Sequence, residues 1–185
     1  MSASALRKSP FPDVRRVVTG HNPAGQATIL EDALQPATSW GGFDTANPKY
    51  DLHYTGRVPA LVDSELSSKD GYGRWVDEMK AHSSDVYAKE GALFRVSDFA
   101  PGSTTPVHRT ESLDYGIVAK GSIVLVLEDG KQVTLGEGDT IIQRATMHSW
   151  RNESGEWARI YFVGLGAKPV VLVDGRELKE EWRSE

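Results

Sequence analysis

The sequence predicts an all-β protein whose strands close into a single barrel or sandwich. Between residues 92 and 164, short runs rich in β-forming residues recur at close intervals and are separated by turns that contain glycine. The tetrapeptide Glu128-Asp129-Gly130-Lys131 is a strong hairpin signal, because an Asp-Gly pair accepts the positive φ angles of a tight turn. The sequence has no visible internal repeat, which argues for one barrel rather than two.

An N-terminal extension is expected before the barrel. Residues 1–12 carry Ser, Pro and basic residues without periodicity, and we interpret them as an arm or as a strand exchanged with a partner. Residues 14–19 and 27–31 flank a turn-rich connection. They predict a hairpin or two adjacent strands.

An irregular insertion is expected next, over residues 38–87. Together with the N-terminal extension it makes up residues 1–90, which we expect to pack on the barrel. Trp75, Val76 and Met79 have helical spacing, which predicts a short helix over residues 73–82. The segment is too long for a bare loop. We expect it to cap one mouth of the barrel or to mediate dimer contacts.

The barrel core is predicted over residues 91–168. Its first strand begins at Ala92, where ALFRVSDF alternates and is rich in β-formers, and further strands are predicted at residues 107–110, 115–119, 122–128, 131–135, 140–143, 148–151 and 158–164. A tail follows over residues 169–185. It is expected to hold a strand at residues 169–173 and a charged end that we interpret as helical.

Length, composition and charge restrict the function. The 185 residues, 39% of them hydrophobic, suffice for one well-buried domain, and the absence of cysteine excludes disulfides, thiolate metal sites and a cysteine nucleophile. Without an apolar run of signal-peptide or membrane-spanning length, the expected location is cytoplasmic and away from membranes. A net charge of −5 with mixed signs offers no basic stripe, so we expect a small-molecule substrate and no nucleic acid.

Three side chains, His108, Asp114 and His148, are the best candidates for a reactive centre. If the run after Gly102 is extended, its two-residue period places four side chains on one face: His108, Thr110, Ser112 and Asp114. Two His and one carboxylate form the minimal ligand set of non-haem iron oxygenases. Without a metal, the same set is a competent acid/base pair, because a carboxylate fixes the imidazole tautomer. The plain alternative is a pair of core or rim histidines without chemistry.

The segment from residue 101 to residue 152 resembles the two sequence motifs of the cupin superfamily. The first motif runs from a glycine through an H-x-H pair and an acidic residue to a second glycine, and its spacing is matched by Gly102, His108, Asp114 and Gly121. The second motif is matched by Gly138, His148 and Asn152. The strings HRTESLDYGIV and GDTIIQRATMHSWRN look like a subgroup of small single-cupin proteins. The resemblance implies a cupin jelly-roll barrel and, because cupin-like chains commonly associate, a homodimer.

Three departures from the cupin pattern bear on metal binding. Thr110 stands where the second His of the pair is expected, so one of the family's usual ligands is missing, and Asp114 replaces the expected Glu. Gln143 or Arg144 stands where the family has proline, in a glycine-to-histidine segment that is one residue shorter. A divalent metal (Fe, Mn, Ni or Zn) held by His108, Asp114 and His148 therefore stays an open alternative, at a degenerate site.

Five further side chains are candidates for substrate binding: Thr110, Tyr115, Arg144, Trp150 and Tyr161. Thr110 could hydrogen-bond a metal-bound water. Arg144 could bind a carboxylate or an enolate with two hydrogen bonds, although a surface cation that balances nearby glutamates is the plain alternative. The aromatic residues could line the cavity or belong to the core, since strand parity alone does not say which face points inward.

The expected function is that of a small-molecule enzyme of the cupin type. We expect a lyase or isomerase step, decarboxylation or dehydration, on a small organic acid or a polyketide-like secondary metabolite. His108 and His148 would act as acid and base, with Asp114 orienting an imidazole. The alternatives are a metal-dependent oxygenase with a 2-His-1-carboxylate site and a non-catalytic cupin that only binds a small molecule.

Overall fold

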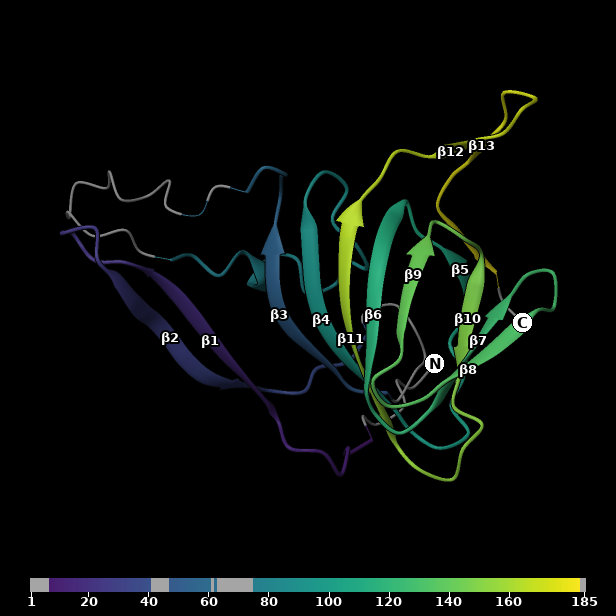
Figure 1. Cartoon of the computed structure of the whole chain (residues 1–185), viewed down its shortest axis with the longest axis horizontal. Coiled ribbons are helices and arrows are strands. Elements are labelled where there is room, and N and C mark those ends of the chain that lie inside the picture. The colour runs from purple at the N-terminus through teal and green to yellow at the C-terminus, as the bar shows by residue number, and fades with distance from the viewer. Residues whose placement is uncertain (1–6, 41–46, 61, 63–74, 184–185) are drawn as a thin grey trace.

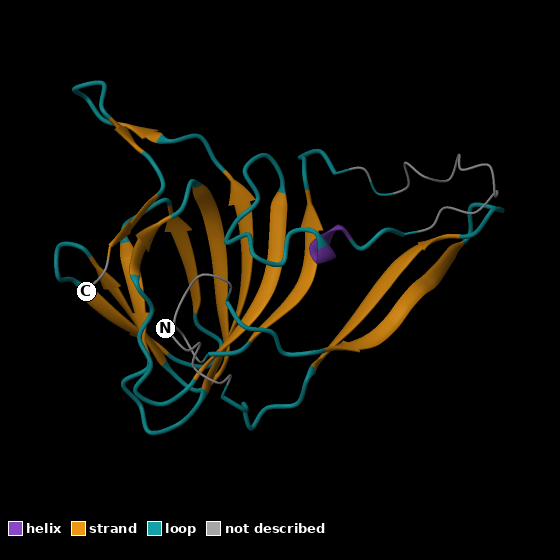
Figure 2. Cartoon of the chain, turned by 180° about the vertical axis from the view of Figure 1, so that it is seen from behind, coloured by secondary structure: helices purple, strands orange, loops and turns teal. Residues whose placement is uncertain are grey.

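Two five-stranded antiparallel sheets curve around a common interior (Figures 1 and 2). The structure, a computed structural model, describes residues 7–40, 47–60, 62 and 75–183. The first sheet has the order β3 (Lys49–Thr55), β4 (Ala92–Phe99), β11 (Ala158–Gly166), β6 (Ser112–Lys120) and β9 (Thr140–Arg144). The second has the order β14 (Glu181–Arg183), β5 (Val107–Arg109), β10 (His148–Arg151), β7 (Ile123–Leu127) and β8 (Gln132–Leu135). The predicted all-β jelly-roll barrel is confirmed.

The core lies between the two sheets. Strand alternation sends every second side chain inward, and eight buried residues from the strands of both sheets meet there: Phe99, Val118, Ile123, Leu125, Leu135, Trp150, Ala158 and Ile160. Burial of each large apolar side chain contributes on the order of 1.5–3 kcal/mol. This cluster fixes the two sheets against each other.

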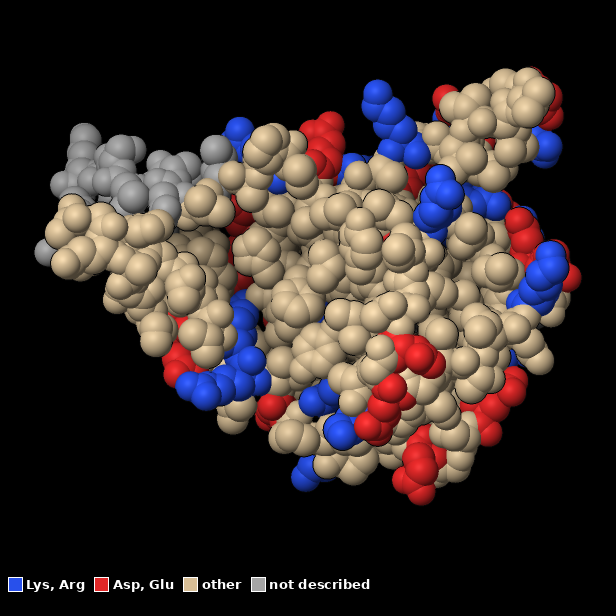
Figure 3. Space-filling model, in the orientation of Figure 1, with Lys and Arg blue, Asp and Glu red and all other residues tan. Residues whose placement is uncertain are grey.

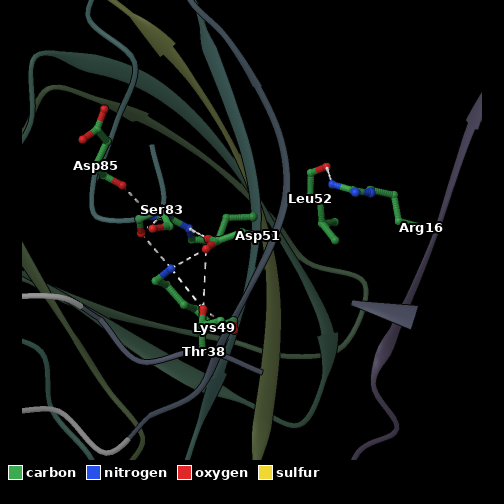
Figure 4. A network of polar contacts seen from close by, with 8 residues as sticks. Arg16, Thr38, Lys49, Asp51, Leu52, Ser83 and Asp85 are labelled. Carbon is green, nitrogen blue, oxygen red and sulfur yellow. Dashed lines mark hydrogen bonds and ion pairs between the residues drawn. The ribbon is translucent and has the colours of Figure 1, made fainter. Parts of the chain in front are cut away.

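A two-stranded hairpin, β1 (Val14–His21) and β2 (Ala27–Gln35), projects beside β3 (Figure 1). The hairpin predicted from the sequence is confirmed and is longer than expected. Its base packs through Val14 on the outer face of the first sheet. Arg16 also ties it to the barrel, because its Nη1 donates to the carbonyl of Leu52 at 2.8 Å (Figure 4) and its Nη2 bonds Asp77 at 2.8 Å.

Three elements differ from the sequence-based expectation. The segment predicted to be irregular contains β3, an edge strand of the first sheet on which Lys49 is buried. The helix predicted over residues 73–82 is wrong within the described residues, which exclude 73 and 74, because only a single 3₁₀ turn, Glu78–Lys80, forms there. The charged end of the tail is not helical: after a small hairpin, β12 (Val170–Val171) with β13 (Glu177–Leu178), β14 pairs with β5.

Within the described ranges, no helix has the length and apolar character needed to cross a membrane.

Candidate functional site

A cavity of about 120 Å³ opens between the two sheets. The first sheet contributes Leu93, Arg95, Ser97, Phe99, Asp114, Gln143, Phe162 and Gly164, and the second sheet with its connections contributes Thr105, Pro106, His108, Thr110, His148, Trp150 and Trp182. The described part of the insertion adds Trp40, Asn47 and Val86 to the wall. The three expected reactive residues therefore share one cavity, enclosed mainly by apolar and aromatic side chains, as ligand sites usually are.

The two imidazoles lie side by side on the second sheet. His108 in β5 and His148 in β10 are directly paired in the strand register, and their ring centroids are 4.3 Å apart. Nδ1 of His108 bonds the carbonyl of Pro106 at 2.9 Å, and Nδ1 of His148 bonds the carbonyl of Thr146 at 2.9 Å. Because a carbonyl only accepts, each Nδ1 must carry the proton, and each Nε2 keeps a free lone pair.

Burial keeps both imidazoles neutral near pH 7. It lowers the pKa of His148 to about 3, with the neighbouring His108 as a second cause. Burial also lowers the pKa of His108 below its ordinary value, against the opposing effect of the bond to Pro106. At neutral pH the pair thus offers two acceptors and no positive charge.

Asp114 stands on the first sheet as a carboxyl group without a cationic partner among the described contacts. Burial raises its pKa to about 6, and the bond from Ser112 Oγ at 3.0 Å opposes that rise only in part. The carboxyl group leans over Gly164, where a Cβ atom would come within 2.7 Å of Oδ1. Glycine at this position therefore makes the room that the carboxyl group occupies.

The expected role of Asp114 in orienting an imidazole needs correction. Both imidazoles are oriented by backbone carbonyls, each from the residue two positions before the histidine. The sequence did not reveal this, because every residue carries a backbone carbonyl. His108 and Asp114 are also not on one strand face. β5 ends at Arg109 and β6 begins at Ser112 in the opposite sheet, so a bend between the sheets brings the two residues to one cavity. Thr110 lies in this bend and accepts from Ser112 Oγ at 2.7 Å.

The donor set does not make a three-ligand metal site. Among the residues that the structure describes, no group of three or more His, Cys, Asp or Glu side chains could hold a metal ion. The two imidazoles alone are one short of the three protein ligands that catalytic zinc sites use. The expected set of His108, Asp114 and His148 is therefore gathered in one cavity but is not assembled around one point.

Some of the candidate substrate-binding residues point into the cavity, and the others lie on the outer face of the first sheet. Thr110 and Trp150 line the cavity, as expected. Tyr115 and Arg144 are exposed on the outer face of the first sheet, and Tyr161 packs there against the cluster at the base of the hairpin. These three expectations are corrected, because the neighbouring residues of each strand take the inward positions: Asp114, Gln143 and Phe162.

Arg95 is the main cavity residue that the sequence reasoning missed. It shares an inward face of β4 with Leu93 and Phe99, and this alternation in ALFRVSDF was the available signal. Its Nε donates to Asp51 Oδ1 at 2.6 Å and its Nη1 donates to the carbonyl of Asp85 at 2.8 Å.

A second cation lies beside Arg95. Nζ of Lys49 donates to Asp51 Oδ2 at 2.6 Å, to Thr38 Oγ1 at 3.1 Å and to the carbonyl of Ser83 at 2.9 Å (Figure 4). Two buried cations therefore share the carboxylate of Asp51. Burial lowers the pKa of both Lys49 and Arg95, and for Lys49 the charge of Arg95 is the second cause. The carboxylate of Asp85 also acts on Arg95, so the two cations face two carboxylates.

Comparison with known proteins gives the family. Residues 95–164 match the Cupin domain family. The chain is 34% identical over 183 residues to the "Phomopsin biosynthesis cluster protein D" of Diaporthe leptostromiformis, which covers 96% of this chain and 92% of that protein. It is 39% identical over 169 residues to the "Cupin-domain-containing oxidoreductase fogC" of Aspergillus ruber, which covers 90% of this chain and 78% of that protein. The chain belongs to the cupin superfamily.

Among solved structures, the polyketide cyclase RemF from Streptomyces resistomycificus has a TM-score of 0.43 and 18% sequence identity to this chain. The match covers 67% of this chain and 68% of RemF.

Proposed function

We propose that this chain is a cupin enzyme of secondary metabolism that catalyses a lyase or isomerase step, above all a dehydration, on a small organic acid. One observation carries the proposal. Two imidazoles with free Nε2 lone pairs face the same cavity as a carboxyl group whose pKa is raised to about 6. Groups that accept and donate protons near neutral pH are the equipment of general acid/base catalysis. The names of relatives from biosynthesis clusters support the metabolic setting.

His108 is the proposed base. Its Nε2 takes a proton from the carbon next to the substrate's carboxylate, and the electron pair of that C–H bond forms a C=C bond. His148 is the weaker base of the two, because its pKa is lowered to about 3. Its Nε2 serves instead as an acceptor for a substrate hydroxyl.

Asp114 is the proposed acid. The C–O bond of the β-hydroxyl breaks with its electron pair on oxygen, and the protonated Asp114 supplies the proton, so that water leaves. The imidazolium then returns its proton to the carboxylate through solvent. The raised pKa supports this role because it leaves the carboxyl group protonated in part near pH 6.

The guanidinium of Arg95, which lines the cavity, supports an acidic substrate. Arg95 has five N–H donors, and its described bonds to Asp51, Ser83 and Asp85 leave two of them available. A substrate carboxylate would bind these two N–H groups. It would also set the direction in which the substrate lies between the two sheets.

The proposal is tested with 3-hydroxy-3-phenylpropanoate, whose dehydration product cinnamate absorbs strongly in the ultraviolet. We expect slow formation of cinnamate by the wild-type protein and a loss of at least about 100-fold in His108→Ala, in line with the usual contribution of a general base. Asp139→Asn, a change in an exposed turn, is the matched control. Benzoylacetate, followed by release of carbon dioxide, tests decarboxylation in the same way. Turnover of neither compound, or equal rates in wild type and His108→Ala, would contradict the proposal.

Oxidoreductase chemistry is the second candidate, and the names of relatives such as the Aspergillus ruber protein favour it. The described residues do not provide a three-ligand metal site. Oxygen consumption with the same two compounds, measured after incubation with Fe²⁺ and again with a chelator, separates the candidates. Uptake that depends on iron would favour the oxidoreductase, and cinnamate formation that is indifferent to the chelator would favour the lyase.

A further inference from the structure

Gln143 carries a buried acceptor that no group among the described residues satisfies. Its side chain lines the cavity from β9 and is 4% exposed, and its Oε1 has no hydrogen-bond partner among the described residues. Buried polar atoms are almost always paired in native proteins, so an unpaired one inside a cavity calls for a partner from outside. Loss of such a pairing costs about 1–3 kcal/mol, which a bound ligand would recover.

The turn between β9 and β10 determines which end of the Gln143 side-chain amide faces the cavity. Nε2 of Gln143 donates to Thr146 Oγ1 at 3.1 Å and approaches the carbonyl of Thr146 at 3.5 Å. Turning the amide over would set its oxygen 3.5 Å from that carbonyl oxygen, which favours the orientation found, although Thr146 Oγ1 can donate as well as accept. Ala145, between them, has a φ of 49°, a conformation that L-residues rarely adopt, and this tight turn holds Thr146 against Gln143. In this orientation the amide oxygen is left for the cavity.

Other polar groups near the Gln143 side-chain oxygen are hydrogen-bond acceptors as well. Asp114 is the strand neighbour of Gln143 in β6 and is an acceptor whenever it is ionised. The two Nε2 atoms of His108 and His148 are acceptors as well. A ligand in this part of the cavity must therefore bring hydrogen-bond donors. A hydroxyl fits better than an ammonium group, because Arg95 lines the same cavity and repels a cation.

We propose that Gln143 is a specificity-determining residue that accepts a hydrogen bond from a hydroxyl of the ligand, so that the cavity selects hydroxylated, ring-bearing acids. The ring is held by the aromatic walls, Trp150 and Phe162, and the carboxylate by Arg95. Ser97 also has an unpaired buried hydroxyl in the cavity, but a hydroxyl can donate or accept, so it specifies neither kind of ligand. The inference rests on the proposed function in one respect, that the cavity is the substrate site.

The test is calorimetric binding of three matched probes: 6-hydroxy-2-naphthoate, 2-naphthoate and 6-methoxy-2-naphthoate. We expect the wild type to bind the hydroxy compound about five- to tenfold more tightly than 2-naphthoate, the effect of one neutral hydrogen bond. The methoxy compound should bind most weakly, because it sets an acceptor against an acceptor. Gln143→Leu should remove the preference, and so should Gln143→Met, which keeps the length of the side chain without an oxygen acceptor. Gln132→Leu, an exposed position on β8, is the control for the Gln-to-Leu change.

Three results would overturn the inference: equal binding of all three probes by the wild type, a hydroxyl preference that persists in Gln143→Leu, or no binding of any probe at millimolar concentration. If Gln143→Leu fails to fold, Gln143→Met and the wild-type ranking still decide. Failure of the proposed function gives a different result. In that case neither 3-hydroxy-3-phenylpropanoate nor benzoylacetate would be turned over, while the preference for the hydroxylated probe would stay.

Discussion

The imidazole of His108 lies flat against the indole of Trp182, with ring centroids 4.5 Å apart and planes inclined by 4°. Trp182 comes from β14, which pairs with β5 in a register that sets Trp182 directly beside His108. Its Nε1 donates to Glu180 at 3.0 Å, which holds the indole in place. The tail thus covers one face of the proposed base, and His148 lies on its other side in the sheet.

Replacement of Trp182 by alanine should raise the pKa of His108 toward its ordinary value. Burial is the first cause of the lowered pKa, and loss of the indole admits water to the ring. The pKa is measured by NMR titration of the imidazole C–H signals, with His108→Ala for the assignment. Trp182→Phe should preserve most of the shift, and Arg183→Ala, an exposed neighbour on the same strand, should change nothing. An unchanged His108 pKa in a folded Trp182→Ala protein would mean that the stack does not control the base.

The sequence predicted the strands well where the signal is local. Runs of β-formers between glycine turns mark β4 to β11, and motif spacing found His108, Asp114 and His148. Trp182 could not be identified as a cavity residue from the sequence. The segment around it has no strand signal and becomes a strand only by pairing with β5. The strand β3 was also missed, because it carries a charged residue that is buried. It buries charged Lys49 through bonds to partners as distant along the chain as Ser83, so its sequence looks like that of an exposed segment.

The alternation of inward and outward side chains along a strand explains why some expected cavity residues were wrong. Tyr115 and Arg144 are attractive binding residues by chemical type, but they alternate with Asp114 and Gln143 along their strands. One face of each strand must point inward, and the motif residue Asp114 fixes that choice for β6. The register then fixes it for β9, because Asp114 is paired with Gln143. Sequence alone does not supply that register.

Asp114→Asn should stabilise the protein above pH 6. The pKa of Asp114 is raised in the folded state to about 6 from 3.8, so the folded protein holds its proton more tightly than the unfolded chain. The stabilisation linked to that proton is complete below the unfolded pKa and is lost as pH rises through the folded value. Asparagine avoids this loss, which is at most about 3 kcal/mol at 1.36 kcal/mol per pKa unit.

The measurement is thermal unfolding of wild type and Asp114→Asn between pH 4 and pH 8. A gain of several degrees is expected at pH 8 for a chain of this size, since about 1 kcal/mol shifts Tm by roughly 2–4 °C. The gain should shrink toward pH 4. Asp139→Asn, an exposed turn position, serves as the control. A gain that does not vary with pH would assign the effect to packing instead of ionisation.

Thr110→His should strengthen metal binding at the cavity. Thr110 lines the cavity with His108 and His148, so a third imidazole there would complete the three-ligand set that the described residues lack. Titration of Mn²⁺ and Zn²⁺ by calorimetry should give at least about tenfold higher affinity than wild type, corresponding to roughly 1.4 kcal/mol. Thr140→His, at an exposed position on β9, is the control. Equal affinity in wild type and Thr110→His would mean that the side chain at residue 110 points away from the two imidazoles.

The outer face of the first sheet is the surface on which we propose that two copies of this chain form a homodimer. Figure 3 shows a broad area over β4, β11 and β6 on which charged side chains are sparse. Three large apolar residues are exposed on the same face of β6 and β9: Tyr115 at 40%, Ile117 at 48% and Ile142 at 62%. Contiguous apolar patches of this kind on a water-exposed sheet usually mark interaction sites, and a two-fold axis lets one patch meet its own copy.

Ile142→Lys should therefore shift the protein from dimer to monomer, because a desolvated ammonium group at the interface has no partner there. Sedimentation velocity across a range of protein concentrations measures the change. Val173→Lys, at the fully exposed tip of the β12–β13 hairpin, introduces the same charge outside the face and should leave the dimer intact. A wild-type protein that stays monomeric at high micromolar concentration, or an Ile142→Lys variant that dimerises as well as wild type, would rule out this face as the interface.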